Sequence, residues 1–229
     1  MFLVMTGLRG DVAELIKAIV LVVAALFPIV NPFGSAAIFV DLTGPIDARL
    51  RDLLARKIST FSFLLLIGSM LFGAKILTFF GVTLYAVQIG GGLVVAVTGW
   101  SLLSQTGSGA TARSATESDI LSNAFFPYTL PITVGPGSNS VAITLGANLS
   151  AELRANSFLA PIVLIASFIG VVLICVVVYL CYRYANAAER LLGTSGTSVV
   201  MRLLSFIMLC IGVQIMANGI RSYLALLPR

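Results

Sequence analysis

Histidine is absent from this chain of 229 residues, charged side chains are scarce, and only three cysteines occur. Asp, Glu, Lys and Arg make up 10% of the chain, whereas roughly a quarter is usual in soluble proteins. The apolar segments contain no paired carboxylates and no cysteine with a base partner, so we expect no enzyme. The cysteines also lack metal-ligand spacing, and we expect neither a cofactor nor a metal site.

What is present is mostly apolar: 59% of the residues are hydrophobic and the mean hydropathy is +1.06. The sequence therefore predicts an all-α integral membrane protein with six transmembrane helices in a lipid bilayer. No remaining segment is long enough for a soluble catalytic or nucleic-acid-binding domain, so the net charge of +5 is a topology signal. Most of the uncharged stretches reach the roughly 20 residues that a spanning helix needs: 18–40, 58–74, 76–112, 120–151, 158–182 and 203–220.

Two similar motifs rich in proline and glycine interrupt the first and fourth of these stretches. Residues 27–35 are FPIVNPFGS and residues 130–138 are LPITVGPGS. Proline lacks an amide donor and clashes with the preceding turn, so we expect the helices to break at 31–34 and at 133–137. Unwound backbone at membrane depth is found where protein buries it or where it lines a wet cavity. The alternative is a pair of kinks that serve packing alone.

The position of the two breaks predicts a repeat. We divide the chain into a first three-helix repeat (1–104), a linker (105–121) and a second three-helix repeat (122–229). Two related units with three spans each must lie in opposite orientations, as in many secondary transporters. The third and sixth helices can be aligned with Gly99 on Gly212 and Gly92 on Ser205. The predicted helices cover 14–42, 58–80, 84–103, 122–149, 158–182 and 199–226, with a charged connector at 47–57.

The chemistry expected at the breaks is that of a small zwitterion. A helix that restarts after a break presents free amides and a partial positive charge, which bind a carboxylate, and Ser35 and Ser138 are typical N-cap residues. Carbonyls freed at 27–30 and 129–133 suit an ammonium group or a small cation. No charged residue lies in a span centre, so the substrate is expected to be net neutral. The predicted substrate-binding residues are Asn31, Pro32, Gly34, Ser35, Thr133, Gly135, Gly137, Ser138 and Asn139.

These two motifs, together with the glycine run at 90–92 and the segment QIMANG at 214–219, resemble the MarC family of bacterial and archaeal membrane proteins. The resemblance covers the whole chain. It implies six spans, a multi-pass location in the prokaryotic cytoplasmic (inner) membrane and kinship with the LysE-type transporter superfamily. Members of the family include a transporter of glycine and alanine. The resemblance implies that the motif positions of the family are Asn31, Pro32, Gly34 and Ser35 in the first repeat, and residues 135–138 in the second.

We therefore hypothesise a secondary transporter of small neutral amino acids of the glycine, alanine and serine type, working by alternating access. An exporter or channel for another small solute and a non-transport membrane partner are the alternatives. Coupling to a proton or a sodium ion is open, because the spans lack histidine and Asp41 is the one acid near a break. The Lys and Arg cluster at 49–57 places both termini outside the cytoplasm. The direction of transport and the oligomeric state are not predicted.

Overall fold

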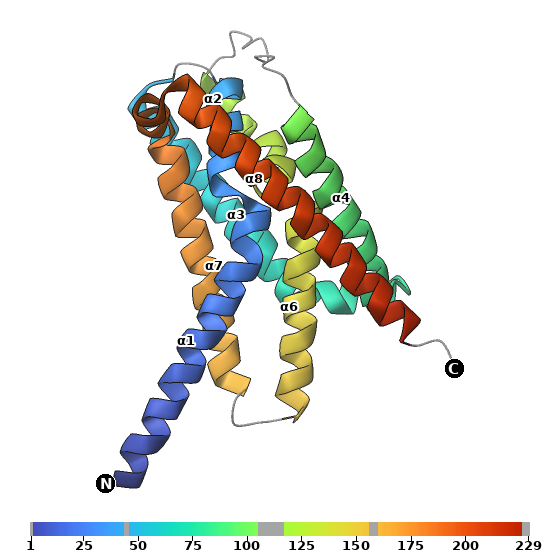
Figure 1. The fold of residues 1–229 in the computed structure, drawn as a ribbon. Coiled ribbons are helices and arrows are strands. Elements are labelled where there is room, and N and C mark those ends of the chain that lie inside the picture. Colours follow the sequence, from blue (N-terminus) through green and yellow to red (C-terminus); the bar gives the residue numbers. More distant parts are fainter. Residues whose placement is uncertain (1, 44–45, 105–116, 156–159, 226–229) are drawn as a thin grey trace.

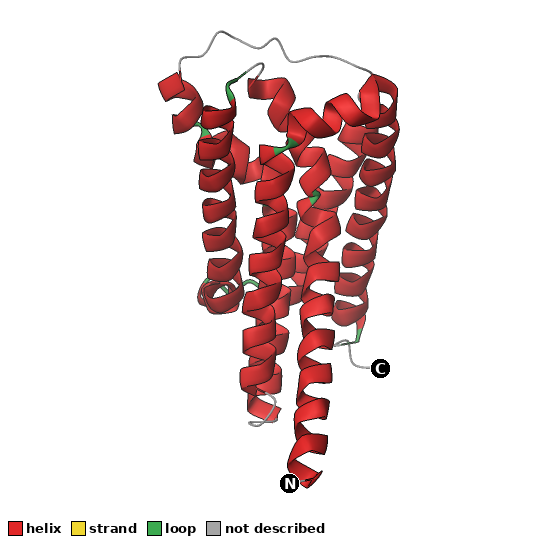
Figure 2. Cartoon of the chain, turned by 90° about the vertical axis from the view of Figure 1, so that its left-hand side faces the viewer, coloured by secondary structure: helices red, strands yellow, loops and turns green. Residues whose placement is uncertain are grey.

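Nine helical segments form the computed structural model, which describes residues 2–43, 46–104, 117–155 and 160–225 (Figure 1). Within these residues the chain is helical and contains no strand (Figure 2). The elements are α1 (Phe2–Val30), α2 (Pro32–Thr43), α3 (Ala48–Phe79), α4 (Leu84–Ser104), α5 (Glu117–Ser122), the π-helix η1 (Ala124–Thr133), α6 (Pro136–Ala155), α7 (Ala160–Arg183) and α8 (Ala185–Leu224).

Among the described residues, five segments are long and apolar enough to cross a membrane. The prediction of an all-helical, multi-span membrane protein is thus confirmed. The fourth predicted span, 122–149, does not appear as one continuous helix because the chain there is divided among α5, η1 and α6. The five segments are Ala13–Val40, Ala48–Phe79, Leu84–Ser104, Leu164–Arg183 and Ser198–Leu224.

Some predicted helix limits are wrong. α4 and α7 match their predicted ranges closely, but the segment 47–57 is the beginning of α3 and not a connector. Asp47 caps this helix by accepting a hydrogen bond of 2.7 Å from the Leu50 amide. Leu50, Leu54 and Ile58 then recur at helical spacing and are buried together with Arg51, whereas Arg49, Arg56 and Lys57 lie on the exposed face of the same amphipathic helix. α1 and α8 likewise begin earlier than predicted, and most of the predicted linker 105–121 lies outside the described residues.

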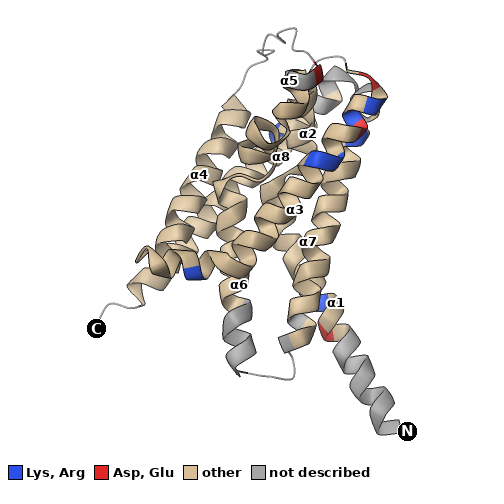
Figure 3. Cartoon of the chain, turned by 180° about the vertical axis from the view of Figure 1, so that it is seen from behind, with Lys and Arg blue, Asp and Glu red and all other residues tan. Residues whose placement is uncertain are grey.

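The charged residues lie mainly at the two ends of the bundle, and the ribbon between them is almost free of charge (Figure 3). Large apolar side chains are exposed along this middle zone, among them Leu64, Leu71, Val97, Leu173 and Phe206. Such a surface would be unfavourable in water but is suited to lipid tails. The structure therefore has the surface of a protein that lies in a bilayer.

The first half of the chain (2–104) and the second half (117–225) are interlocked. α3 packs mainly on α6 and α7 of the second half and also contacts η1, while α7 packs mainly on α1 and α3 of the first half and also contacts α2. α4 lies along α8 and also contacts α6, while α8 also contacts α1 and α2. Each broken helix is thus held mostly by helices of the other half.

α4 and α8 form a close antiparallel pair through small residues. A Cβ atom added to Gly92 would lie 2.7 Å from the Gly212 carbonyl oxygen, and one added to Gly99 would lie 2.9 Å from that of Ser205. Small residues allow such close backbone approach between membrane helices. Contact between this pair and the remaining helices includes a small apolar cluster of Ile29, Val95 and Met208, whereas the main core lies among α1, α2, α3, η1, α6 and α7.

Candidate functional site

The first break is confined to one residue, Asn31, which separates α1 from α2. Its φ of 45° is in the left-handed region, which asparagine tolerates better than most residues. Its side-chain oxygen accepts a hydrogen bond of 3.1 Å from the Gly34 amide, so Asn31 is the N-cap of α2. A Cβ atom on Gly34 would lie 2.3 Å from the Asn31 side-chain nitrogen. Glycine at this position therefore leaves room for the cap.

The prediction that Ser35 caps this helix is wrong. Ser35 lies one turn inside α2, and its hydroxyl donates to the Asn31 carbonyl at 2.9 Å. Pro32 occupies the first helical position, where the missing amide of proline costs nothing. This moves the cap back to Asn31. The Phe27 carbonyl, predicted to be free, accepts from the Asn31 amide at 3.0 Å.

Val134 and Gly135 separate η1 from α6 at the second break, and the irregular backbone reaches further back, because Phe126 and Leu130 within η1 have non-helical φ and ψ angles. Pro136 takes the first helical position of α6, as Pro32 does in α2. Ser138 lies inside the helix, so its predicted role as N-cap is also wrong, and the cap position is held by Gly135, which has no side chain. The amides of Gly137 and Ser138 accordingly find no acceptor among the described residues. The Thr129 carbonyl, predicted to be free, accepts from the Val134 amide at 2.8 Å.

Both breaks line the same cavity of about 320 Å³, which also borders α4 and Met208 of α8. Six of the nine predicted site residues contribute to its wall: Asn31, Ser35, Thr133, Gly135, Gly137 and Ser138. Pro32, Gly34 and Asn139 are not among the lining residues, and Asn139 instead accepts a hydrogen bond of 3.1 Å from Ser69 of α3. That any of these residues binds a substrate stays a prediction.

The wall of the cavity is neutral. Its polar part consists of Asn31, Ser35, Thr98, Thr133 and Ser138 together with break backbone, and the rest is aliphatic. None of the described lining residues carries a charge. The described part of the chain also contains no group of three His, Cys, Asp or Glu residues placed to hold a metal ion. The side chain of Asp41 lies outside the described residues.

Sequence reasoning missed Tyr182, at the end of α7. Its side chain is fully buried, its hydroxyl lies 2.6 Å from the Thr133 hydroxyl of η1, and its ring packs against Phe39 of α2. Tyr182 therefore contacts both broken helices. No sequence signal marks it, because it is one of several aromatic residues near a helix end and its partners are far away in the chain.

The glycine run at 90–92 serves two helix contacts. A Cβ atom on Gly91 would lie 2.4 Å from the Ser140 Cβ of α6, whereas one on Gly92 would meet α8. Ser140 also donates to the Val87 carbonyl of α4 at 3.0 Å. The run thus allows α4 to lie against α6 and α8 together, beside the cavity.

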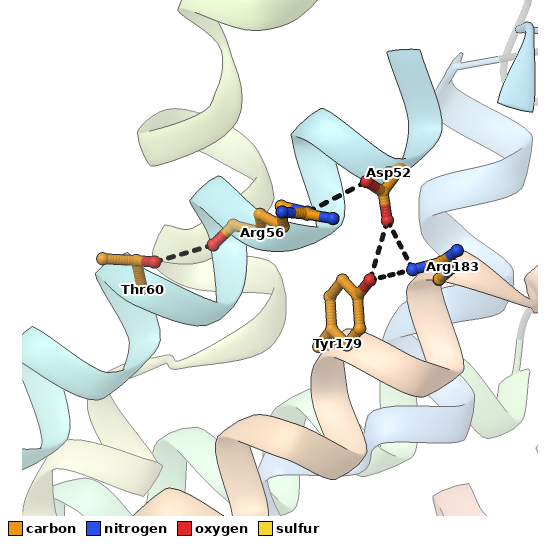
Figure 4. A network of polar contacts seen from close by, with 5 residues as sticks. All are labelled: Asp52, Arg56, Thr60, Tyr179 and Arg183. Carbon is orange, nitrogen blue, oxygen red and sulfur yellow. Dashed lines mark hydrogen bonds and ion pairs between the residues drawn. The ribbon is translucent and has the colours of Figure 1, made fainter. Parts of the chain in front are cut away.

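A second polar cluster joins the first turns of α3 to the last turn of α7 (Figure 4). The Asp52 carboxylate pairs with Arg56 at 2.9 Å and Arg183 at 3.0 Å, and it accepts from the Tyr179 hydroxyl at 2.7 Å. An open groove of about 390 Å³ lies beside Arg56 and Tyr179. Arg183 and Tyr179 of α7 both contact Asp52 of α3, so the cluster links these two helices.

Comparison with known proteins is consistent with this architecture. The sequence profile described as MarC family integral membrane protein matches residues 16–224. Proteins named UPF0056 inner membrane protein MarC from Salmonella typhimurium and Salmonella typhi are 28% identical over 214 residues, covering 90% of this chain and 96% of theirs. The protein of the same name from Escherichia coli O139:H28 has the same identity and coverage. No solved structure matches the chain significantly. The chain therefore belongs to the MarC family, and it is a multi-pass protein of the inner membrane.

Proposed function

We propose that this protein is a secondary transporter that carries small neutral amino acids of the glycine, alanine and serine type across the inner membrane. The observation that carries the proposal is that both helix breaks line one neutral cavity of about 320 Å³. Its volume lies at the low end of the roughly 300–1,000 Å³ of small-molecule sites. A small solute fits such a space, and the uncharged wall favours a solute without net charge.

The proposal includes six membrane crossings arranged as two inverted repeats. The described chain begins and ends on the same side of the bundle (Figure 1), which requires an even number of crossings. The five candidate spans then need a sixth, and α5, η1 and α6 together supply a path from one end to the other. Orientation with both termini outside the cytoplasm is part of the same proposal.

The α4–α8 contact supports an inverted repeat. The sequence aligns Gly92 with Ser205 and Gly99 with Gly212. When the two halves are exchanged, the contact between Gly92 and Gly212 therefore corresponds to a contact between Ser205 and Gly99. Both contacts are observed. A contact that maps onto itself in this way is expected for two halves related by a two-fold axis in the membrane plane.

The two breaks favour ligand groups of opposite charge. In α2 the Asn31 side chain accepts from the Gly34 amide, and Phe33 does not line the cavity, whereas the Gly137 and Ser138 amides of α6 lack an acceptor among the described residues and both residues line the cavity. We therefore assign the substrate carboxylate to the α6 end, where the helix dipole favours an anion. The Val30 carbonyl receives no amide bond, since its helical partner Gly34 is bound to Asn31. This carbonyl suits the ammonium group.

The test is uptake of radiolabelled alanine into liposomes that contain the purified protein and unlabelled alanine, glycine or serine, without an ion gradient. We expect saturable counterflow that competing glycine reduces. Imposed proton and sodium gradients then show which ion, if either, drives transport. A folded protein that produced no counterflow of any of the three amino acids would refute the proposal. No enzymatic step or cofactor forms part of it.

A further inference from the structure

The groove of about 390 Å³ between α3 and α7 lies on the outside of the bundle, where Arg56, Thr60 and Val176 are exposed. The two helices touch here, because the Ser59 hydroxyl of α3 donates a hydrogen bond of 2.7 Å to the Cys175 carbonyl of α7. Both helices contain candidate membrane spans, so the groove opens toward lipid. Its lining residues are Arg56, Ser59, Thr60, Val176 and Tyr179.

One end of this groove carries an unbalanced positive charge. The Asp52 carboxylate pairs with both Arg56 and Arg183, and two positive charges against one negative charge leave a net charge of +1 (Figure 4). Arg56 bonds Asp52 through its Nε atom, and its two terminal amino groups find no acceptor among the described residues. The Arg56 side chain is 64% exposed. Its terminal N–H groups are therefore available to an anion.

The groove leads from this charged end into the apolar zone of the bundle. Val176 is exposed, and one turn further from the charged end Leu64 of α3 and Leu173 of α7 are exposed as well. α3 has no charged residue from 58 to 74, and α7 has none from 160 to 182. The shape and chemistry of the groove therefore suit a ligand with an anionic group at one end and hydrocarbon at the other.

We propose that this groove binds a phospholipid with a negatively charged headgroup: the phosphate lies against the Arg56 guanidinium, and an acyl chain follows the groove past Val176. Basic pockets between membrane helices bind anionic lipid headgroups, and a planar guanidinium group matches two phosphate oxygens. A zwitterionic phospholipid brings its own positive charge to the same place and is the weaker ligand. The site is independent of the proposed transport, since the groove shares no lining residue with the cavity.

The test is a titration of the purified protein in neutral detergent with phosphatidylglycerol, followed by native mass spectrometry. Arg56→Gln leaves Asp52 bound to Arg183 and Tyr179, so the link between the helices persists. Lys75→Gln is the matched control, because Lys75 is exposed at the other end of the same helix. We expect Arg56→Gln to raise the dissociation constant of the first bound lipid roughly fivefold, Arg56→Lys to raise it less, and Lys75→Gln to leave it unchanged.

Equal weakening by Arg56→Gln and Lys75→Gln, or no weakening by Arg56→Gln, would overturn the inference, because binding would then follow net charge or bypass the groove. Equal binding of phosphatidylcholine and phosphatidylglycerol to the wild type would overturn it as well. Glycerol phosphate has the anionic group without acyl chains, and we expect it not to displace phosphatidylglycerol at equal concentration. Full displacement would show a site for a soluble anion instead. Failure of alanine counterflow would leave all of these results unaffected.

Discussion

Substitutions of Asn31 test most directly what stabilises the first helix break. It serves two purposes that different substitutions separate: its side chain caps α2, and its backbone adopts a φ of 45°. Asn31→Ala removes the cap, which costs about 1 kcal/mol, and places a residue with a Cβ atom in the left-handed region, which costs about 1–2 kcal/mol. Asn31→Gly loses the cap but adopts the backbone freely, and glycine at an N-cap costs only a few tenths of a kcal/mol (about 0.3).

We therefore expect Asn31→Ala to destabilise the protein by about 2–3 kcal/mol and Asn31→Gly by well under 1 kcal/mol, that is about 0.3. For a chain of this length 1 kcal/mol corresponds to a shift of about 2–4 °C in the unfolding midpoint. Circular dichroism of the purified variants during heating measures the shift in the unfolding midpoint. Asn31→Asp keeps both the acceptor and the backbone tolerance, but it places a carboxylate at a buried and uncharged site. Because a buried unpaired charge is unfavourable, it should be less stable than the wild type and should lower alanine counterflow.

Equal losses of stability for Asn31→Ala and Asn31→Gly would refute this reasoning, because they would show that the left-handed backbone contributes nothing. A stable Asn31→Ala variant would show that the Gly34 amide finds another acceptor.

Two further predictions concern the glycines beside the cavity. A Cβ atom on Gly137 would lie 1.9 Å from a methyl group of Val95, so Gly137→Ala should reduce counterflow severalfold, and adding Val95→Ala should restore most of it; failure of that rescue would contradict the contact. A Cβ atom on Gly212 would lie 2.3 Å from the backbone nitrogen of Ala96. Because backbone cannot yield as a side chain does, Gly212→Ala should lower the unfolding midpoint by several degrees (about 5 °C) whatever side chain is changed nearby, and an unchanged midpoint would contradict it.

The positions of both breaks could be predicted from the sequence because proline acts locally: Pro32 and Pro136 cannot donate to the preceding turn, whatever surrounds them. The capping residues could not be assigned in the same way. Serine is a typical N-cap, but Pro32 fits the first helical position so well that the cap falls on Asn31, and at the second break it falls on Gly135. The preference of serine for the N-cap and that of proline for the first helical position compete within four residues, and the sequence alone does not show which one determines the cap.

Features that depend on tertiary contacts were out of reach. The burial of Leu50, Leu54 and Ile58 turns a charged segment into the first turns of α3, and a count of charges does not show it. Tyr182 meets Phe39 and Thr133 only because α7 packs beside both broken helices. The alignment of Gly92 with Ser205 suggested a repeat, yet only the structure shows that α4 and α8 pack on each other.

The interlocked halves limit which movement can open the cavity. Rocking of the first half against the second would separate α3 from α6 and α7, and α1 from α7, which are the main contacts of the core. Movement of the α4–α8 pair against the other helices leaves those contacts intact and disturbs instead the contact of α4 with α6 and the smaller cluster of Ile29, Val95 and Met208. We therefore expect the pair, and not one repeat, to move during transport.

A cross-link between α3 and α6 distinguishes the two movements. Ser69 and Asn139 are hydrogen-bonded at 3.1 Å, belong to different halves and do not line the cavity. In a background without the three native cysteines, Ser69→Cys with Asn139→Cys can be joined by a short bifunctional thiol reagent and compared with the same variant before joining. Because the link leaves α4 and α8 free, counterflow should persist at a similar rate after joining. Loss of counterflow on joining would show that the halves themselves must separate, since nothing else is restrained by a bond between these two helices.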